Sequence, residues 1–126
     1  MAGKIIADTL EHSTAGSVTT DYVVNGSAKA WMQLNGTGTI AIQGSFNTTS
    51  ATDNGTGDYT QTFSSALANN DFSVVSDGSV SNDTYNQGTA ASSPTTTTCR
   101  VNCWNTATDG QADFNQVYTS IHGDLA

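Results

Sequence analysis

The chain has 126 residues, of which 36% are hydrophobic and 11% charged, so its length fits one domain and its polar composition favours strands over helices. Three basic and eleven acidic residues give a net charge of −8, which argues against binding to nucleic acid or to an anionic membrane surface. No apolar run approaches the length that spans a bilayer, so we expect no membrane insertion.

Residues 1–25 show weak periodicity and are predicted to form an N-terminal attachment segment ahead of one β-sandwich domain at 26–126. Ile5, Ile6 and Leu10 fit either a short strand or one helical turn, and the pattern does not decide between them. A polar chain end with a few apolar anchors orders poorly alone and is typical of a segment that docks on a partner. We therefore expect these three side chains at a subunit contact.

Two successive hairpins, forming a β-meander, are predicted between residues 30 and 63. Side chains alternate with a period of two, with Ala28, Ala30, Met32 and Leu34 on one face and Lys29, Trp31 and Gln33 on the other. Asn35-Gly36 predicts a type I′ turn, because both residues tolerate the positive φ that this turn needs. A second turn at residues 53–57 precedes a strand at 58–63.

The remainder of the chain predicts three more strands. The first, at 72–76, stops at Asp77-Gly78 and is followed by a long surface loop from Ser79 to Pro94, which contains at most one strand around Thr84 and Tyr85. Residues 95–104 form the next strand, Asp109-Gly110 turns the chain, and residues 114–121 form the last. Regularly spaced turns predict an all-β, antiparallel sandwich of seven or eight strands, either jelly-roll or immunoglobulin-like.

The two cysteines indicate buried thiols. Cys99 and Cys103 share one face of the predicted strand, and four residues at about 3.3 Å each place them roughly 13 Å apart. Disulfide-bonded Cα atoms lie within about 7 Å of each other, so the strand excludes a bond between these two. Zinc would need His12 and His122 as well, and neither has ligand-like spacing.

A glycine-rich turn that carries Asp53, Asn54 and Asp58 could offer oxygen ligands to calcium. The spacing does not match an EF-hand loop, and turn capping by Asx side chains explains the same residues. The chain also has no Gly-x-Ser-x-Gly elbow and no phosphate-binding loop. We expect no catalytic residue, no cofactor and no metal.

Trp31 and Trp104 occupy the otherwise polar faces of their strands, beside Lys29 and Arg100. Three explanations remain open: a strand assignment that is off by one residue, a subunit interface rich in aromatic and Arg side chains, or a sugar-stacking surface. We place both tryptophans, with Ile5, Ile6 and Leu10, in the predicted subunit interface.

The segment NGTGTIAIQGSFNTTSATDNGTGDYTQTF at 35–63 resembles a module of tail-fibre-like and other virion structural proteins of tailed bacteriophages, particularly marine ones. AKAWMQLNGTGT at 28–39, ADTL at 7–10, SVTT at 17–20 and the terminal GDLA at 123–126 extend the resemblance over most of the chain. Such modules occur on fibres, spikes and capsid decorations alike.

The resemblance implies a non-catalytic protein at the virion surface, a homotrimeric fibre or spike that contacts other virion proteins and takes part in host attachment. A capsid decoration or head-fibre protein is one alternative. The other is a carbohydrate-binding module that recognises a host-surface glycan, which would require the two tryptophans to face one groove.

Overall fold

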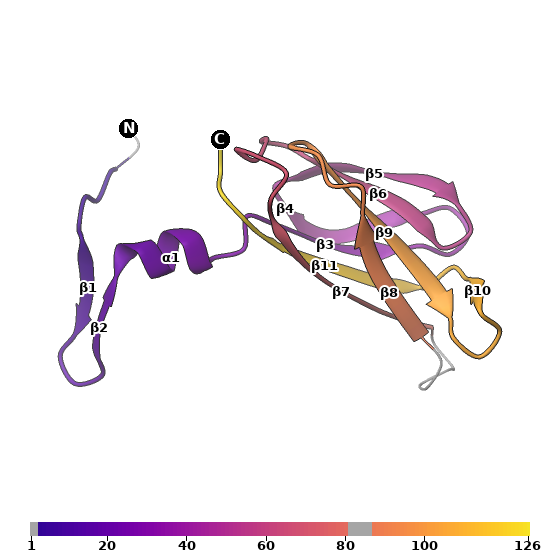
Figure 1. Ribbon diagram of the computed structural model, residues 1–126, viewed down its shortest axis with the longest axis horizontal. Coiled ribbons are helices and arrows are strands. Elements are labelled where there is room, and N and C mark those ends of the chain that lie inside the picture. Colours follow the sequence, from indigo (N-terminus) through magenta and orange to yellow (C-terminus); the bar gives the residue numbers. More distant parts are fainter. Residues whose placement is uncertain (1–2, 81–86) are drawn as a thin grey trace.

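A computed structural model describes residues 3–80 and 87–126, which form two antiparallel sheets packed into a sandwich, with a small N-terminal hairpin and helix beside it (Figure 1). The four-stranded sheet has the order β4-β3-β11-β7, with bounds Ala41–Phe46, Ala30–Asn35, Gln116–His122 and Ser73–Ser79. The five-stranded sheet has the order β10-β9-β6-β5, with bounds Gly110–Gln111, Thr98–Asn105, Asp58–Phe63 and Thr48–Gly55, and β8 (Gln87–Ser92) pairs with β9. The predicted all-β antiparallel sandwich is confirmed.

The first hairpin, β3–β4, forms without the predicted type I′ turn. Neither Asn35 nor Gly36 has a positive φ; Asn35 continues β3 opposite Ala41, and residues 36–40 make the connection, with Gly38 at φ 63°. Gly36 serves close packing instead, since a Cβ there would lie 2.3 Å from the hydroxyl oxygen of Tyr59. The turn prediction was wrong because Gly36 is needed for its close contact with Tyr59, which is distant in the sequence, and not for a positive φ.

The second hairpin, β5–β6, has the turn that was predicted, with Gly55 and Gly57 both at positive φ. The two hairpins do not form a meander, because β4 belongs to one sheet and β5 to the other. Asn47, at φ 51°, lies where the chain crosses between the sheets. Its amide nitrogen donates to the carbonyl oxygens of Lys29 at 3.0 Å and Ser65 at 3.1 Å.

The predicted long loop from Ser79 to Pro94 is wrong in its second half, which is strand β8. All six residues of Gln87–Ser92 pair with β9, on the edge of β9 that β6 does not occupy. The sequence did not predict this strand because the run shows little hydrophobic alternation of its own, and its pairing depends on the free backbone groups of β9. The strand expected at Thr84 and Tyr85 lies outside the described residues. The strand predicted at 72–76 is β7, which continues through Gly78 to Ser79.

The core lies between the sheets in two clusters. One contains Met32, Leu34, Tyr59, Val101, Cys103, Phe114 and Val117, and the other contains Ala30, Phe63, Leu67, Cys99 and Ile121. Both cysteines are free and buried, as predicted. Burial raises the pKa of the Cys99 thiol to about 11 and, with help from nearby acids, that of Cys103 to about 12.

Polar groups also join the sheets through the core. The Gln61 side chain donates to Thr48 Oγ1 and accepts from Thr119 Oγ1, both at 2.7 Å. The Tyr59 hydroxyl donates toward the carbonyl oxygen of Gly36 and toward Asp113 Oδ1, each at 2.9 Å. These bonds satisfy buried polar groups and fix how the two sheets lie against each other.

Candidate assembly surface

The N-terminal segment folds as a hairpin followed by a helix: β1 (Thr9–His12) pairs with β2 (Gly16–Thr19), and α1 spans Thr20–Gly26. His12 Nδ1 stabilises the hairpin turn by accepting the backbone N–H groups of Thr14 at 3.2 Å and Ala15 at 3.1 Å. Leu10 lies in strand β1, whereas Ile5 and Ile6 precede it in a segment without regular secondary structure. Of the two alternatives, the strand holds for Leu10, and neither holds for Ile5 and Ile6.

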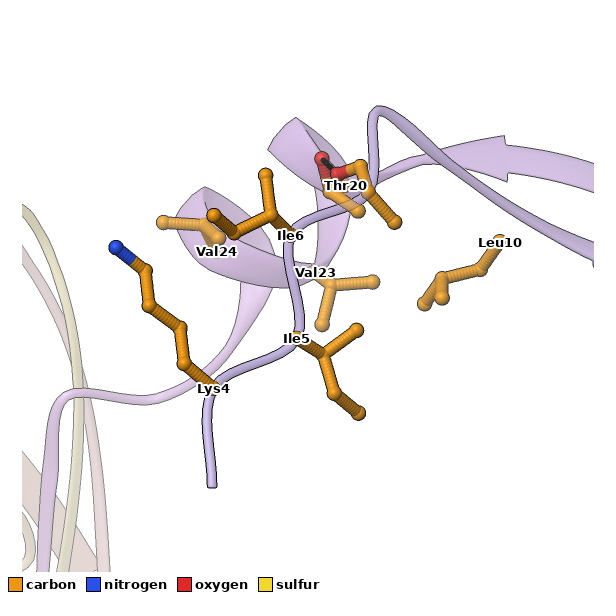
Figure 2. Close-up of a pocket in the computed structure, with 8 residues that line it drawn as sticks. Lys4, Ile5, Ile6, Leu10, Thr20, Val23 and Val24 are labelled. Carbon is orange, nitrogen blue, oxygen red and sulfur yellow. Dashed lines mark hydrogen bonds between the residues drawn. The ribbon is translucent and has the colours of Figure 1, made fainter. Parts of the chain in front are cut away.

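Ile5, Ile6 and Leu10 line the same groove. They line a groove of about 510 Å³ whose opposite wall is formed by Val23 and Val24 of α1 (Figure 2). The exposed fractions of Ile5 and Ile6 are 91% and 82%, and no residue of α1 is buried. Apolar side chains clustered at this exposure are typical of an interaction surface.

The outer face of the four-stranded sheet carries a second apolar set. Ala30 and Met32 point into the core, so Trp31 between them points outward, as the predicted alternation requires. The strand register places Phe46, Trp31, Ser120 and Val75 in one row across the four strands. Phe46, Trp31 and Val75 are 55%, 42% and 62% exposed.

Trp31 covers part of the neighbouring strand. A Cβ added at Gly44 of β4 would lie 3.5 Å from the indole Cζ3 atom, so the ring lies over a glycine that has no side chain of its own. One face of the indole ring therefore packs on β4, and the rest of the ring is exposed to solvent. A large, rigid aromatic surface in this arrangement suits a protein contact.

A second groove joins the two apolar sets. It has a volume of about 570 Å³ and lies between α1 and the sandwich. Its apolar lining comes from Val23 and Val24 of α1, Phe46 at the end of β4, and Leu125 near the C-terminus. Through Phe46 it continues into the outer row of the four-stranded sheet. We call the two grooves and this row the assembly surface.

Trp104 does not belong to the assembly surface. It lies on β9 beside the buried Cys103 and points to the outer face of the other sheet, where it is partly buried. Trp31 and Trp104 therefore lie on opposite faces of the sandwich and cannot line one groove. The carbohydrate-binding alternative required both tryptophans to face one groove, and the structure does not place them so.

Two of the three basic residues are engaged within the chain. Arg100 forms an ion pair with Asp58, with its Nε donating to Oδ1 at 2.6 Å, and this contact lowers the pKa of the Asp58 carboxyl. Lys29 was expected on a polar strand face but is buried. Its ammonium group donates to the carbonyl oxygens of Val24 and Ser27 at the end of α1, and these hydrogen bonds compensate for its loss of contact with water. Lys4 has no ion pair within residues 3–80 and 87–126.

The turn that was weighed as a calcium site is explained by hydrogen bonds within the chain. Asp53 Oδ1 accepts the backbone N–H of Gly55 at 2.9 Å, which is Asx-turn capping, and Asp58 is held by Arg100 and by Asn54. Among the described residues, no three His, Cys, Asp or Glu side chains gather as a metal site would need.

Sequence reasoning missed part of the assembly surface, chiefly Val23, Val24, Phe46, Val75 and Leu125. The Val23-Val24 pair in an otherwise polar segment was a usable signal. Phe46 and Val75 could be found only by knowing that β4 and β7 flank the same sheet, because their row depends on strand order.

In the part of the chain that is described, no helix is long and apolar enough to cross a membrane. Comparison with protein-family models, with curated proteins and with solved structures finds no match to this chain.

Proposed function

We propose that this chain is a non-catalytic structural protein at the surface of a tailed-bacteriophage virion, a homotrimeric fibre or spike that takes part in host attachment. The single observation that supports an assembly role is the assembly surface itself, which runs from the N-terminal hairpin and helix across the outer face of one sheet. The phage assignment and the trimer rest on the resemblance of residues 28–63 and of the two chain ends.

The distribution of exposed side chains indicates which faces would contact other subunits and which would face solvent or host. Exposed apolar groups are concentrated on the N-terminal segment and the four-stranded sheet, so these would contact other copies or other virion proteins. The opposite sheet and its turns are polar and would face solvent or host. Desolvating apolar side chains stabilises such contacts at roughly 25 cal/mol per Å² buried, less the cost of association.

Substitution of Trp31 tests this proposal. We expect Trp31→Ala to lower the molecular mass of the assembled protein, measured by light scattering after size exclusion, because the indole is exposed on the assembly surface. Trp104→Ala, on the opposite sheet and outside the assembly surface, is the matched control and should leave the mass unchanged. A lower mass for this variant would instead place Trp104 at a second subunit contact, as the sequence pattern predicts. If neither variant changes the mass and Trp31→Ala only lowers stability, the four-stranded sheet is not a subunit contact and the proposal fails.

A further inference from the structure

The groove between α1 and the sandwich has one exposed acidic side chain at its edge as well as an apolar lining. Lys29 also lines it, but its ammonium group is engaged by the carbonyl oxygens of Val24 and Ser27. Phe46 and Leu125, each more than half exposed, form one side, and Val23 and Val24 of α1 form the other. Asp124 also lines the groove and is exposed. An occupant that fits this groove would combine adjacent aliphatic side chains with a positive charge.

The chain itself contains a segment of that chemistry. Lys4 is followed directly by Ile5 and Ile6, the most exposed of the large hydrophobic side chains described. Within residues 3–80 and 87–126, Lys4 is also the one basic residue that forms no ion pair and is not buried, in a chain whose net charge is −8. Few surfaces of so acidic a protein can offer a cation next to two isoleucines.

Within one chain this segment lines the first groove and does not line the second. The Thr20 hydroxyl donates to the carbonyl oxygen of Ala7 at 2.9 Å, and the Thr20 N–H donates to that of Asp8 at 3.0 Å. These bonds hold the end of the segment against the start of α1, on the side of the first groove (Figure 2). The second groove shares Val23 and Val24 with the first and continues past the end of α1 to Lys29 and Leu125.

We infer that residues 4–7 of one copy dock in the groove between α1 and the sandwich of a second copy. Ile5 and Ile6 pack against Phe46 and Leu125, and Lys4 lies beside Asp124. The inference rests on the proposed self-assembly and names its contact. The two surfaces differ, so the contact is head-to-tail, and three copies close a ring when successive docking rotates each by one third of a turn.

Cysteine cross-linking between different copies tests the contact, because the two native cysteines are buried and introduced thiols would be the only exposed ones. Ile6→Cys and Leu125→Cys chains are co-expressed and oxidised, and the disulfide-linked products are separated by mass. We expect the mixed product in excess over random pairing. Ile6→Cys with Thr52→Cys, whose residue is exposed on β5 in the opposite sheet and lies outside the assembly surface, is the matched control and should show no excess.

A charge exchange tests the same contact without cross-linking. Lys4→Glu and Asp124→Lys should each weaken assembly about two- to fivefold, the range for an exposed ion pair, and the double variant should restore it. If the protein is trimeric but shows neither mixed-product excess nor restoration, the docking inference is wrong while the structural role stands. A disulfide formed within one chain of an Ile6→Cys/Leu125→Cys variant would likewise overturn the inference. Absence of the protein from virions would overturn the proposed function, whatever the cross-linking shows.

Discussion

Replacing Gln61 by methionine tests whether the polar connection between the sheets stabilises the fold. The side chain is fully buried on β6, and its two hydrogen bonds, each 2.7 Å long, reach Thr48 of β5 and Thr119 of β11. Thr119 is also buried, and its hydroxyl donates across the core to Gln61. Gln61→Met keeps a similar length and shape but removes both bonds and leaves the Thr119 hydroxyl without this acceptor.

The expected loss follows from these contacts. Each hydrogen bond contributes about 1 kcal/mol net, and orphaning a buried polar group costs about 1–3 kcal/mol, so Gln61→Met should lower the free energy of unfolding by about 2–4 kcal/mol. Thr119→Val should lower it by about 1–3 kcal/mol, because it orphans the Gln61 carbonyl oxygen. The double variant removes both orphans and should cost about 1–2 kcal/mol less than the sum of the two.

Urea denaturation followed by tryptophan fluorescence measures all three variants. The matched control is Gln33→Met, since Gln33 bonds Gln43 on the exposed face of β3, and its loss should stay within about 0.5 kcal/mol. Additive losses for the two core variants would refute the reasoning, because they would mean that the Gln61–Thr119 bond contributes no coupling.

Two further predictions concern a turn and an ion pair. Gly38 and Gly57 have nearly equal φ, 63° and 64°, but a Cβ meets nothing within 4 Å at Gly38 and three backbone atoms within 2.8 Å at Gly57. Gly38→Ala should therefore cost about 1–2 kcal/mol and Gly57→Ala about 2–5 kcal/mol in urea denaturation, and equal costs would contradict the packing argument. Because Arg100 lowers the pKa of Asp58 below its ordinary 3.8 in the folded chain, the pair should stabilise the fold above about pH 4 and lose this contribution as pH falls below that. Arg100→Gln should flatten this acid dependence of the unfolding free energy, and an unchanged pH profile would show that the pair contributes nothing.

Local chemistry made some features of the fold predictable from the sequence. The alternation of residues 28–34 correctly separates the buried Met32 from the outward Trp31, because a strand period of two survives in any sheet order. The turn before β6 was predictable because Gly55 and Gly57 supply positive φ where the chain reverses. Both signals act over a few residues.

Features that depend on distant contacts were not predictable. Gly36 is required by the Tyr59 ring, and β8 is a strand because β9 offers an open edge. The crossing between sheets at Asn47 likewise depends on how the whole sandwich closes. For the assembly surface, Ile5, Ile6 and Trp31 could be singled out as apolar side chains in polar surroundings, whereas Phe46 joins them only through its register with Trp31.

The most direct test of the virion assignment is the copy number of this chain per purified phage particle, measured by quantitative mass spectrometry against the major capsid protein. A fibre or spike predicts a few copies, in multiples of three. A copy number comparable to that of the capsid protein would contradict the fibre and indicate a capsid decoration or head fibre, and absence from particles would contradict the virion assignment itself.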